Sequence, residues 1–256
     1  MNGIHRASSA STHHGKAALI KPLHYDDALI TSLIPYGEAD CIVRMLTKGH
    51  GRLAAFYKGG LATKKNRSAA QAAVFSHVGF VEHATKMPTI KSIDTDPMFN
   101  DLKDIKVFAF RAYVAELIEK LIPEGEACPQ VFMLALETFE ALQALGARSI
   151  ILRAFELKLL DYCGYLPEIY ADFAVQFFDP VHQRFLATKE EGAIPFSKDA
   201  LHLAQAMLIA KVGSMAYEGN ELMMIARIFQ NRLKLMGLLP LKSVEFLRQL
   251  SGRKQT

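Results

Sequence analysis

The 256-residue sequence has only three cysteines, no tryptophan and no long hydrophobic run. The cysteines stand far apart at positions 41, 128 and 163 without a C-x-x-C spacing, which argues against a disulfide framework and a four-cysteine zinc site. The longest stretch without Asp, Glu, Lys or Arg runs for 14 residues, from Ser68 to Val81, whereas a membrane helix needs about 20. We therefore expect a protein of a reducing compartment, the cytoplasm, with no membrane partner.

The sequence also lacks the common catalytic signatures. It contains no P-loop, G-x-G-x-x-G, H-E-x-x-H or G-x-S-x-G motif. Carboxylates do occur in pairs, among them Glu116 with Glu119, but a two-metal nuclease needs acids that converge in a cleft, and solvation explains this pair on one helix face. We expect no catalytic residue, no metal and no cofactor.

Charge of one sign is missing from one segment. The net charge is +4, and it divides into +5 for residues 1–100 (12 basic, 7 acidic) and −1 for residues 101–256 (18 basic, 19 acidic). No acidic residue occurs from Cys41 to Val81. The segment contains seven cations: Arg44, Lys48, Arg52, Lys58, Lys64, Lys65 and Arg67. A local field of this sign suits a polyanion, although a solvated basic loop would show the same composition.

The order of strand-like and helical patterns along the sequence predicts an α+β protein, with an all-β part followed by an all-α part. Residues 1–22 are small and polar and are expected to form a disordered tail. Residues 23–98 contain five stretches of β-forming residues separated by turn signals, and five strands in about 70 residues match an OB-fold barrel. The strands are expected at 28–36, 39–47, 52–58, 72–83 and 87–94.

The remaining residues, 99–256, follow a helical period and predict a helical domain of five or six helices. Pro129 opens one helix and Gly146 ends it, while Ser197 and Ser243 are expected to be N-caps of later helices. The helix after Ser197 is expected to reach Ser214. Residues 165–196 are weakly patterned and are expected to form an irregular insert.

The basic segment supplies the candidate DNA-binding residues. Strand alternation turns Arg44 away from Val43 and Met45, and a tight turn exposes backbone amides around His50. A loop is expected to follow and to track a phosphate backbone without reading sequence. Because Phe56 and Tyr57 must face opposite sides of one strand, Tyr57 is either a base-stacking ring or ordinary barrel surface. The full candidate set is Arg44, Lys48, His50, Arg52, Tyr57, Lys58, Lys64, Lys65 and Arg67.

Several motifs resemble, in order, those of the bacterial recombination mediator family RecO. The resemblance begins with Tyr36-Gly37-Glu38-Ala39-Asp40 and Lys58-Gly59 in the first domain. In the second domain it is carried by Leu121-Ile122-Pro123-Glu124, Arg153-Ala154-Phe155-Glu156-Leu157, Gly164-Tyr165 and Pro240-Leu241-Lys242-Ser243. It covers roughly residues 23–250 and implies an N-terminal OB-fold followed by a helical domain.

One departure from the family pattern concerns zinc. Many proteins of the family that this sequence resembles carry a four-cysteine zinc ribbon shortly after the residues that match Gly164-Tyr165. Here the segment from Pro167 to Phe185 contains no cysteine. His182 alone cannot hold zinc. We predict that the ribbon is absent and that Phe173, Phe177 and Phe178 hold this region by apolar packing.

The resemblance implies a non-catalytic function. RecO-like proteins bind single- and double-stranded DNA, anneal complementary strands, associate with RecR, recognise the acidic C-terminal tail of single-stranded DNA-binding protein and so serve RecA indirectly. Arg153 is the candidate for the tail carboxylate, with a salt bridge on a core-facing helix as the rival interpretation. Arg232 and Lys234 are further partner-binding candidates, although both side chains could simply extend their charges to solvent.

Two other functions fit the same features. An OB-fold with basic loops could bind structured RNA, because the fold serves both nucleic acids. A nuclease could bring acidic residues together from both domains.

Overall fold

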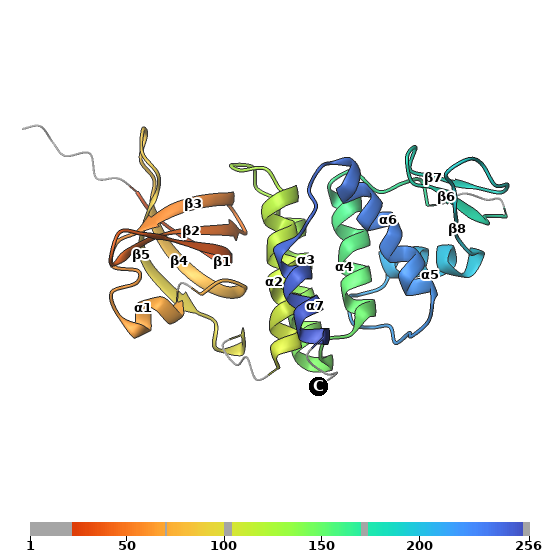
Figure 1. Cartoon of the computed structure of the whole chain (residues 1–256). Helices are drawn as coiled ribbons and strands as arrows, with labels where there is room; N and C mark the ends of the chain where they lie inside the picture. The colour runs from red at the N-terminus through yellow and green to blue at the C-terminus, as the bar shows by residue number, and fades with distance from the viewer. Residues whose placement is uncertain (1–21, 70, 100–103, 170–173, 253–256) are drawn as a thin grey trace, which may run out of the picture.

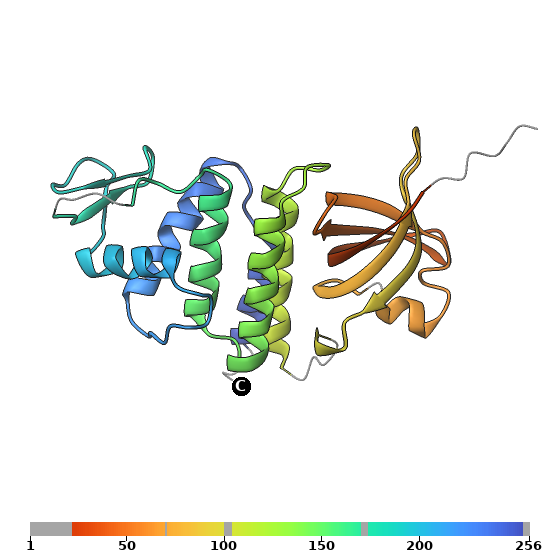
Figure 2. The same ribbon diagram turned by 180° about the vertical axis from the view of Figure 1, so that it is seen from behind.

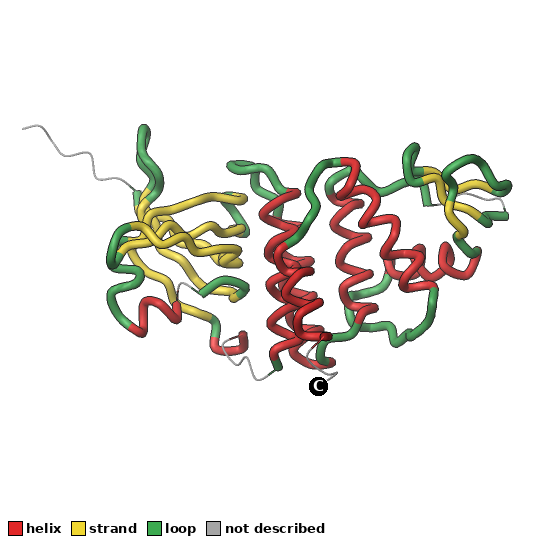
Figure 3. The backbone as a smooth tube through the Cα atoms, in the orientation of Figure 1, coloured by secondary structure: helices red, strands yellow, loops and turns green. Residues whose placement is uncertain are grey.

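The computed structural model describes residues 22–69, 71–99, 104–169 and 174–252, so almost all of the expected tail at residues 1–22 lies outside the described residues. A β-barrel stands at one end, helices follow it, and a small sheet lies at the other end (Figure 1, Figure 3). This arrangement confirms the predicted α+β class.

The barrel is closed by five strands in the order β1-β2-β3-β5-β4. Their positions agree with the sequence prediction to within a few residues. Antiparallel pairs join β1 to β2 and β4, β2 to β3, and β4 to β5, while a parallel contact between Phe56 and Thr89 closes the barrel. The strands are β1 (Leu23–Tyr36), β2 (Asp40–Thr47), β3 (Gly51–Tyr57), β4 (Val74–Val81) and β5 (Thr89–Thr95).

The basic loop expected after β3 contains a short helix, α1 (Lys64–Ala69). Thr63 Oγ1 accepts a hydrogen bond from the Asn66 amide at 3.1 Å, and the Asn66 side chain donates to the carbonyl of Gly59 at 2.9 Å. These local bonds fold the segment back on itself. Six residues make fewer than two turns, which is too short for a helical period to show in the sequence.

The described residues of the second domain form six helices: α2 (Ile105–Leu121), α3 (Pro129–Leu145), α4 (Ser149–Tyr162), α5 (Lys198–Ile209), α6 (Glu221–Leu235) and α7 (Lys242–Gly252). A 3₁₀ turn, η1 (Pro97–Phe99), precedes them. Ser197 is the N-cap of α5, as predicted, and its hydroxyl accepts from the Ala200 amide at 3.1 Å. The helix ends at Ile209 rather than Ser214, because Ala210 turns to an extended conformation and Val212 then donates its amide to Glu137.

The region 165–196 is not irregular throughout. It forms a three-stranded sheet of β6 (Phe177–Asp179), β7 (Arg184–Leu186) and β8 (Ile194–Pro195). Phe178, Phe185 and Phe196 pack against one another in tilted contacts, with ring centroids 5.0–6.2 Å apart. Strands of two or three residues are too short to show alternation. Phe178 is fully buried as expected, while Phe173 lies outside the described residues.

Two acidic residues that were attributed to solvation link separate parts of the chain. Glu116 on α2 accepts the backbone amides of Lys242 and Ser243 at 3.0 and 2.9 Å and the Ser243 hydroxyl at 2.6 Å. Ser243, the expected N-cap, therefore lies inside α7, and a carboxylate from another helix satisfies the amides at its start. Glu119 pairs with Arg44 of the barrel at 2.5 Å.

The barrel and the helices share one core. Leu29, Leu46 and Phe75 point outward from the barrel and belong to the helical hydrophobic cluster rather than the barrel interior. The ring of Phe75 lies 5.2, 5.4 and 5.1 Å from those of Phe99, Phe132 and Phe139. Figure 2 shows the same junction from behind, with the barrel beside α2 and α3. Apolar burial therefore fixes the two domains against each other.

Phe75→Ala is expected to lower the free energy of unfolding by about 3–5 kcal/mol, because it leaves a cavity among three rings. Tyr25→Ala is the matched control: Tyr25 lies on the outer face of the same two-strand pair but is exposed, and we expect a loss below about 1 kcal/mol. Urea unfolding measures both. A loss below about 1 kcal/mol for Phe75→Ala would contradict the shared core.

Candidate nucleic-acid interface

The turn between β2 and β3 presents Lys48 and His50. Asp26 of β1 holds this turn: its Oδ2 accepts the Gly49 amide at 2.9 Å and lies 2.7 Å from His50 Nδ1. Thr47 accepts the His50 amide at 2.9 Å. Burial raises the pKa of Asp26, but the hydrogen bonds from His50 and Gly49 outweigh it and leave the pKa below its usual value. Lys48 is exposed beside this ordered turn.

Two of the predicted cations have internal partners at the junction with the helices. Arg44 pairs with Glu119, as described above. Arg52 is only 14% exposed; its Nε donates to the Ile122 carbonyl at 2.6 Å and its Nη1 lies 3.2 Å from Glu124. The backbone reinforces this contact, because the Gly125 amide donates to the Arg52 carbonyl at 2.9 Å. Both arginines therefore hold the barrel against the helices, and their binding to DNA stays a prediction.

Three further exposed lysines, Lys58, Lys64 and Lys65, lie on the part of the barrel away from the helices. Lys58 follows β3, and Lys64 and Lys65 open α1, which Figure 1 places on the far side of the barrel. Within the described residues none of the three has an ion-pair partner. The side chain of Arg67 lies outside what the structure describes. Three unpaired cations close together in the chain suit a sequence-independent phosphate contact.

The predicted DNA-binding residues do not form one cluster. Lys48 and Lys58 lie at opposite ends of β3, and seven residues of strand separate them by roughly 20 Å. A nucleic acid that reached both would follow the barrel along the β3 strand rather than bind at one point. The described candidates other than Tyr57 therefore fall into three groups. These are the turn between β2 and β3 with Lys48 and His50, the basic end of the barrel with Lys58, Lys64 and Lys65, and the junction with Arg44 and Arg52.

Tyr57, the candidate for base stacking, has its ring turned toward the barrel interior, and its stacking role stays a prediction. Tyr57 is half-buried and packs against the barrel interior, and burial raises its pKa. Its neighbour Phe56 points outward and meets Tyr36 in an edge-to-face contact, with ring centroids 5.8 Å apart. Tyr36 is 60% exposed. Alternation required Phe56 and Tyr57 to face opposite sides, but it could not tell which side faces solvent.

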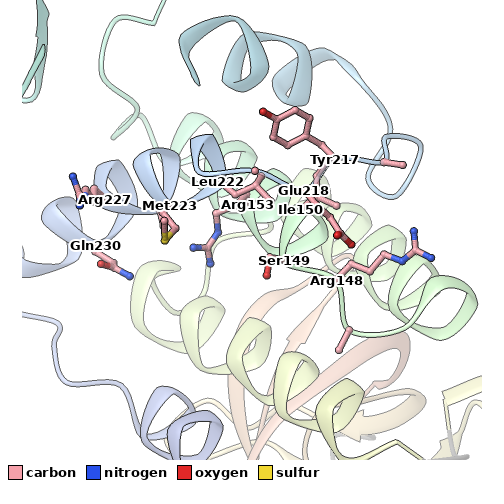
Figure 4. A pocket seen from close by; sticks show the side chains of 14 residues that line it. Arg148, Ser149, Ile150, Arg153, Tyr217, Glu218, Leu222, Met223, Arg227 and Gln230 are labelled. Atoms are coloured by element: carbon pink, nitrogen blue, oxygen red, sulfur yellow. The ribbon is translucent and has the colours of Figure 1, made fainter. Parts of the chain in front are cut away.

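The first of the predicted partner-binding residues, Arg153, lines a groove of about 900 Å³ between α4 and α6. Figure 4 shows its side chain between Ser149 of α4 and Met223 of α6. Arg153 donates to Glu156 at 2.6 Å, and the buried Glu156 also accepts from the Tyr113 hydroxyl at 2.5 Å. Burial raises the pKa of Glu156, which Arg153 opposes. Arg153 therefore forms the salt bridge of the rival interpretation and also lines the groove.

The other two partner-binding candidates differ in their surroundings. Arg232 lies over the ring of Tyr165, with 6.0 Å from its guanidinium carbon to the ring centroid. Lys234 is exposed in the last turn of α6. Neither residue lines the groove that contains Arg153.

The described residues offer neither a membrane-spanning helix nor a cluster of metal ligands. No helix there is long and apolar enough to cross a membrane. In the same part of the chain, no group of three or more His, Cys, Asp or Glu side chains is placed to hold a metal ion.

Comparison with known proteins gives the family. Residues 22–96 match the family described as Recombination protein O N terminal, and residues 102–222 match Recombination protein O C terminal. The chain belongs to the RecO family. The two RecO matches occur in the expected order, and the first ends just before η1.

Curated RecO relatives agree with this result, and each is named DNA repair protein RecO. The chain is 33% identical over 146 residues to the protein of Myxococcus xanthus, covering 56% of this chain and 59% of that one. It is 34% identical over 139 residues to that of Alkaliphilus metalliredigens, covering 52% and 55%. These matches therefore span little more than half of the relatives' length. The Bacillus pumilus protein matches over 245 residues, 90% and 95% of the two chains, at 24% identity.

Replacing Lys58, Lys64 and Lys65 together by Ala is expected to weaken binding to all DNA sequences and to flatten its salt dependence. The slope of log K against log salt should fall by roughly 0.7 per lost contact for single strands and 0.9 for duplex. Fluorescence anisotropy across a salt series measures the slope.

The matched control replaces Lys189, Lys198 and Lys211 by Ala, three exposed lysines of the helical domain. This control removes the same charge from elsewhere on the surface. An equal loss of slope in both variants would show that total charge, and not the basic end of the barrel, governs binding.

Proposed function

We propose that this chain is a non-enzymatic DNA recombination mediator. It binds single- and double-stranded DNA through the barrel, anneals complementary strands, and cooperates in the cytoplasm with RecR and single-stranded DNA-binding protein so that RecA can load. Membership of the RecO family supports the role in DNA repair and recombination. The proposals for DNA binding, annealing and partner binding rest on the exposed lysines of the barrel and on the groove that contains Arg153.

One observation carries the proposal: the cations that remain without partners on the acid-free segment are exposed. Lys48, Lys58, Lys64 and Lys65 have no ion-pair partner among the described residues, while the two arginines of that segment near the helices are paired. Annealing requires that two repelling phosphate chains be neutralised together, and it breaks no covalent bond. A cationic surface is sufficient for that task.

The groove between α4 and α6 supports binding of the acidic tail. A peptide that ends in a hydrophobic residue and a carboxylate needs an apolar pocket with a cation at its edge. Leu222 and Met223 supply apolar surface, and Arg153, Arg148 and Arg227 supply positive charge around it. Arg227 is exposed, whereas Arg153 is 16% exposed and fixed by Glu156.

Annealing is the direct test of the proposed function. The full chain, in buffer with EDTA and without ATP, is expected to accelerate pairing of two complementary labelled DNA strands. The Lys58/Lys64/Lys65→Ala variant should lose most of this acceleration, because phosphate neutralisation drives it. Magnesium-dependent cleavage of either strand would favour the nuclease, and stronger binding to RNA of the same sequence would favour the RNA-binding alternative.

Arg153→Gln is expected to weaken binding of a tail peptide with a free C-terminal carboxylate by about tenfold or more, since a charge-assisted hydrogen bond is lost. Affinity for DNA should not change. Titration calorimetry with the peptide and anisotropy with DNA measure the two affinities.

The same peptide with an amidated C-terminus is the control for this substitution. If Arg153 binds the carboxylate, the amidated peptide binds the wild type weakly and loses little further affinity to Arg153→Gln. Equal losses for both peptides would mean that Arg153 acts only through the buried Glu156, and the carboxylate assignment would be wrong.

A further inference from the structure

A second groove lies at the junction of the barrel with α2 and α7. Its volume is about 820 Å³, and it contains none of the residues that line the groove of Arg153. One wall is the second half of β1, from Thr31 to Ile34, and the other walls come from α2 and α7. Figure 1 shows α7 alongside α2. The groove is lined by Arg44 and Arg52, which have internal partners, but by none of the unpaired lysines of the proposed DNA surface and by no residue of the tail-peptide site.

The wall supplied by β1 is a strand with one open edge. Leu23 to Ile30 pair with β4, whereas the residues from Ser32 to Tyr36 pair only with β2. A register shift between Ile30 and Ser32 marks the change. Along residues 32–36 no other described strand pairs with the opposite edge, so backbone groups there, apart from the N–H that Pro35 lacks, are available to an added strand.

Two hydroxyl groups beside this edge have no partner. Thr31 Oγ1 and Ser32 Oγ make no hydrogen bond in the described part of the chain, and Thr31 is only 6% exposed. A buried polar group without a partner costs about 1–3 kcal/mol. Both residues line the groove, but their hydroxyl oxygens are themselves buried, so a bound peptide would hydrogen-bond to them only after a local side-chain rearrangement.

The free charges of the groove are positive. Its three glutamates are already engaged: Glu119 with Arg44, Glu124 with Arg52, and Glu116 with the start of α7. Lys120 and Lys242 are exposed, and no described residue forms an ion pair with either. Ile34, Phe108 and Phe246 add apolar surface to the lining of the same groove.

From these features we propose that the groove binds an extended acidic peptide segment of a partner protein, which adds as a strand to β1 along residues 32–36. The strand edge recognises the peptide backbone, the apolar wall takes alternate side chains, and Lys120 and Lys242 pair with carboxylates. A nucleic acid would use the lysines but leave the strand edge unpaired, because its backbone has no amide groups.

The probe is a fluorescent peptide of alternating glutamate and valine, acetylated and C-terminally amidated so that it lacks a terminal carboxylate. It is expected to bind the full chain. The Lys120→Glu/Lys242→Glu variant should bind it at least about tenfold more weakly, because two ion pairs become repulsions. The same peptide N-methylated at alternate amides keeps its side chains but cannot donate to a strand edge, and its binding should be lost.

The matched charge control is Lys198→Glu/Lys211→Glu, two exposed lysines outside the groove. Equal weakening in this control, or unchanged binding of the N-methylated peptide, overturns the proposal. A loss of affinity for single-stranded DNA with unchanged peptide binding in the Lys120/Lys242 variant also overturns it, because the groove would then belong to nucleic acid.

Thr31→Val separates a binding role from a structural one. It replaces an unpaired hydroxyl by a methyl group of similar size, so urea unfolding should show no loss of stability in the free protein. Peptide affinity should fall severalfold. Reduced stability with unchanged affinity would show that the hydroxyl serves the fold and would contradict the proposed contact.

Discussion

Phe75 leaves the outer face of the barrel and enters a cluster of rings from η1 and α3, and much else in the molecule follows from that contact. An outward-facing phenylalanine on a barrel strand has to be covered, and here helices cover it. Polar groups next to the covered area must then find partners inside the protein. Arg44 and Arg52 find them in Glu119, Glu124 and the Ile122 carbonyl. The positive charge left for other molecules is consequently moved to the turns and to α1.

Much of the fold was predictable from local patterns. Strand alternation, Pro129 at a helix start and Ser197 as an N-cap are properties of short stretches, and the structure confirms them. The run Ala28–Ile30, part of the first predicted strand, is buried on both faces. The helix α1 and the strands β6 to β8 were missed because they are shorter than the periods that reveal such elements.

The candidate site was predictable only in part, because pairing between distant residues leaves no local signal. Arg44 and Glu119 are 75 residues apart, and Arg52 reaches a backbone carbonyl 70 residues away, which no side-chain pattern can encode. The choice between Phe56 and Tyr57 depended on which face the barrel closes around. Glu116 resembled a solvated helix residue until α7 placed its first amides against it.

The continuous core also determines where bound molecules lie relative to one another. Because packed rings join the barrel to the helices, α1 and the groove between α4 and α6 stay on opposite sides of the junction (Figure 1). The shared core therefore fixes the distance between these two surfaces. If DNA binds at the barrel and a partner protein at α6, as proposed, the two are kept a fixed distance apart, so only a strand longer than that distance can connect them.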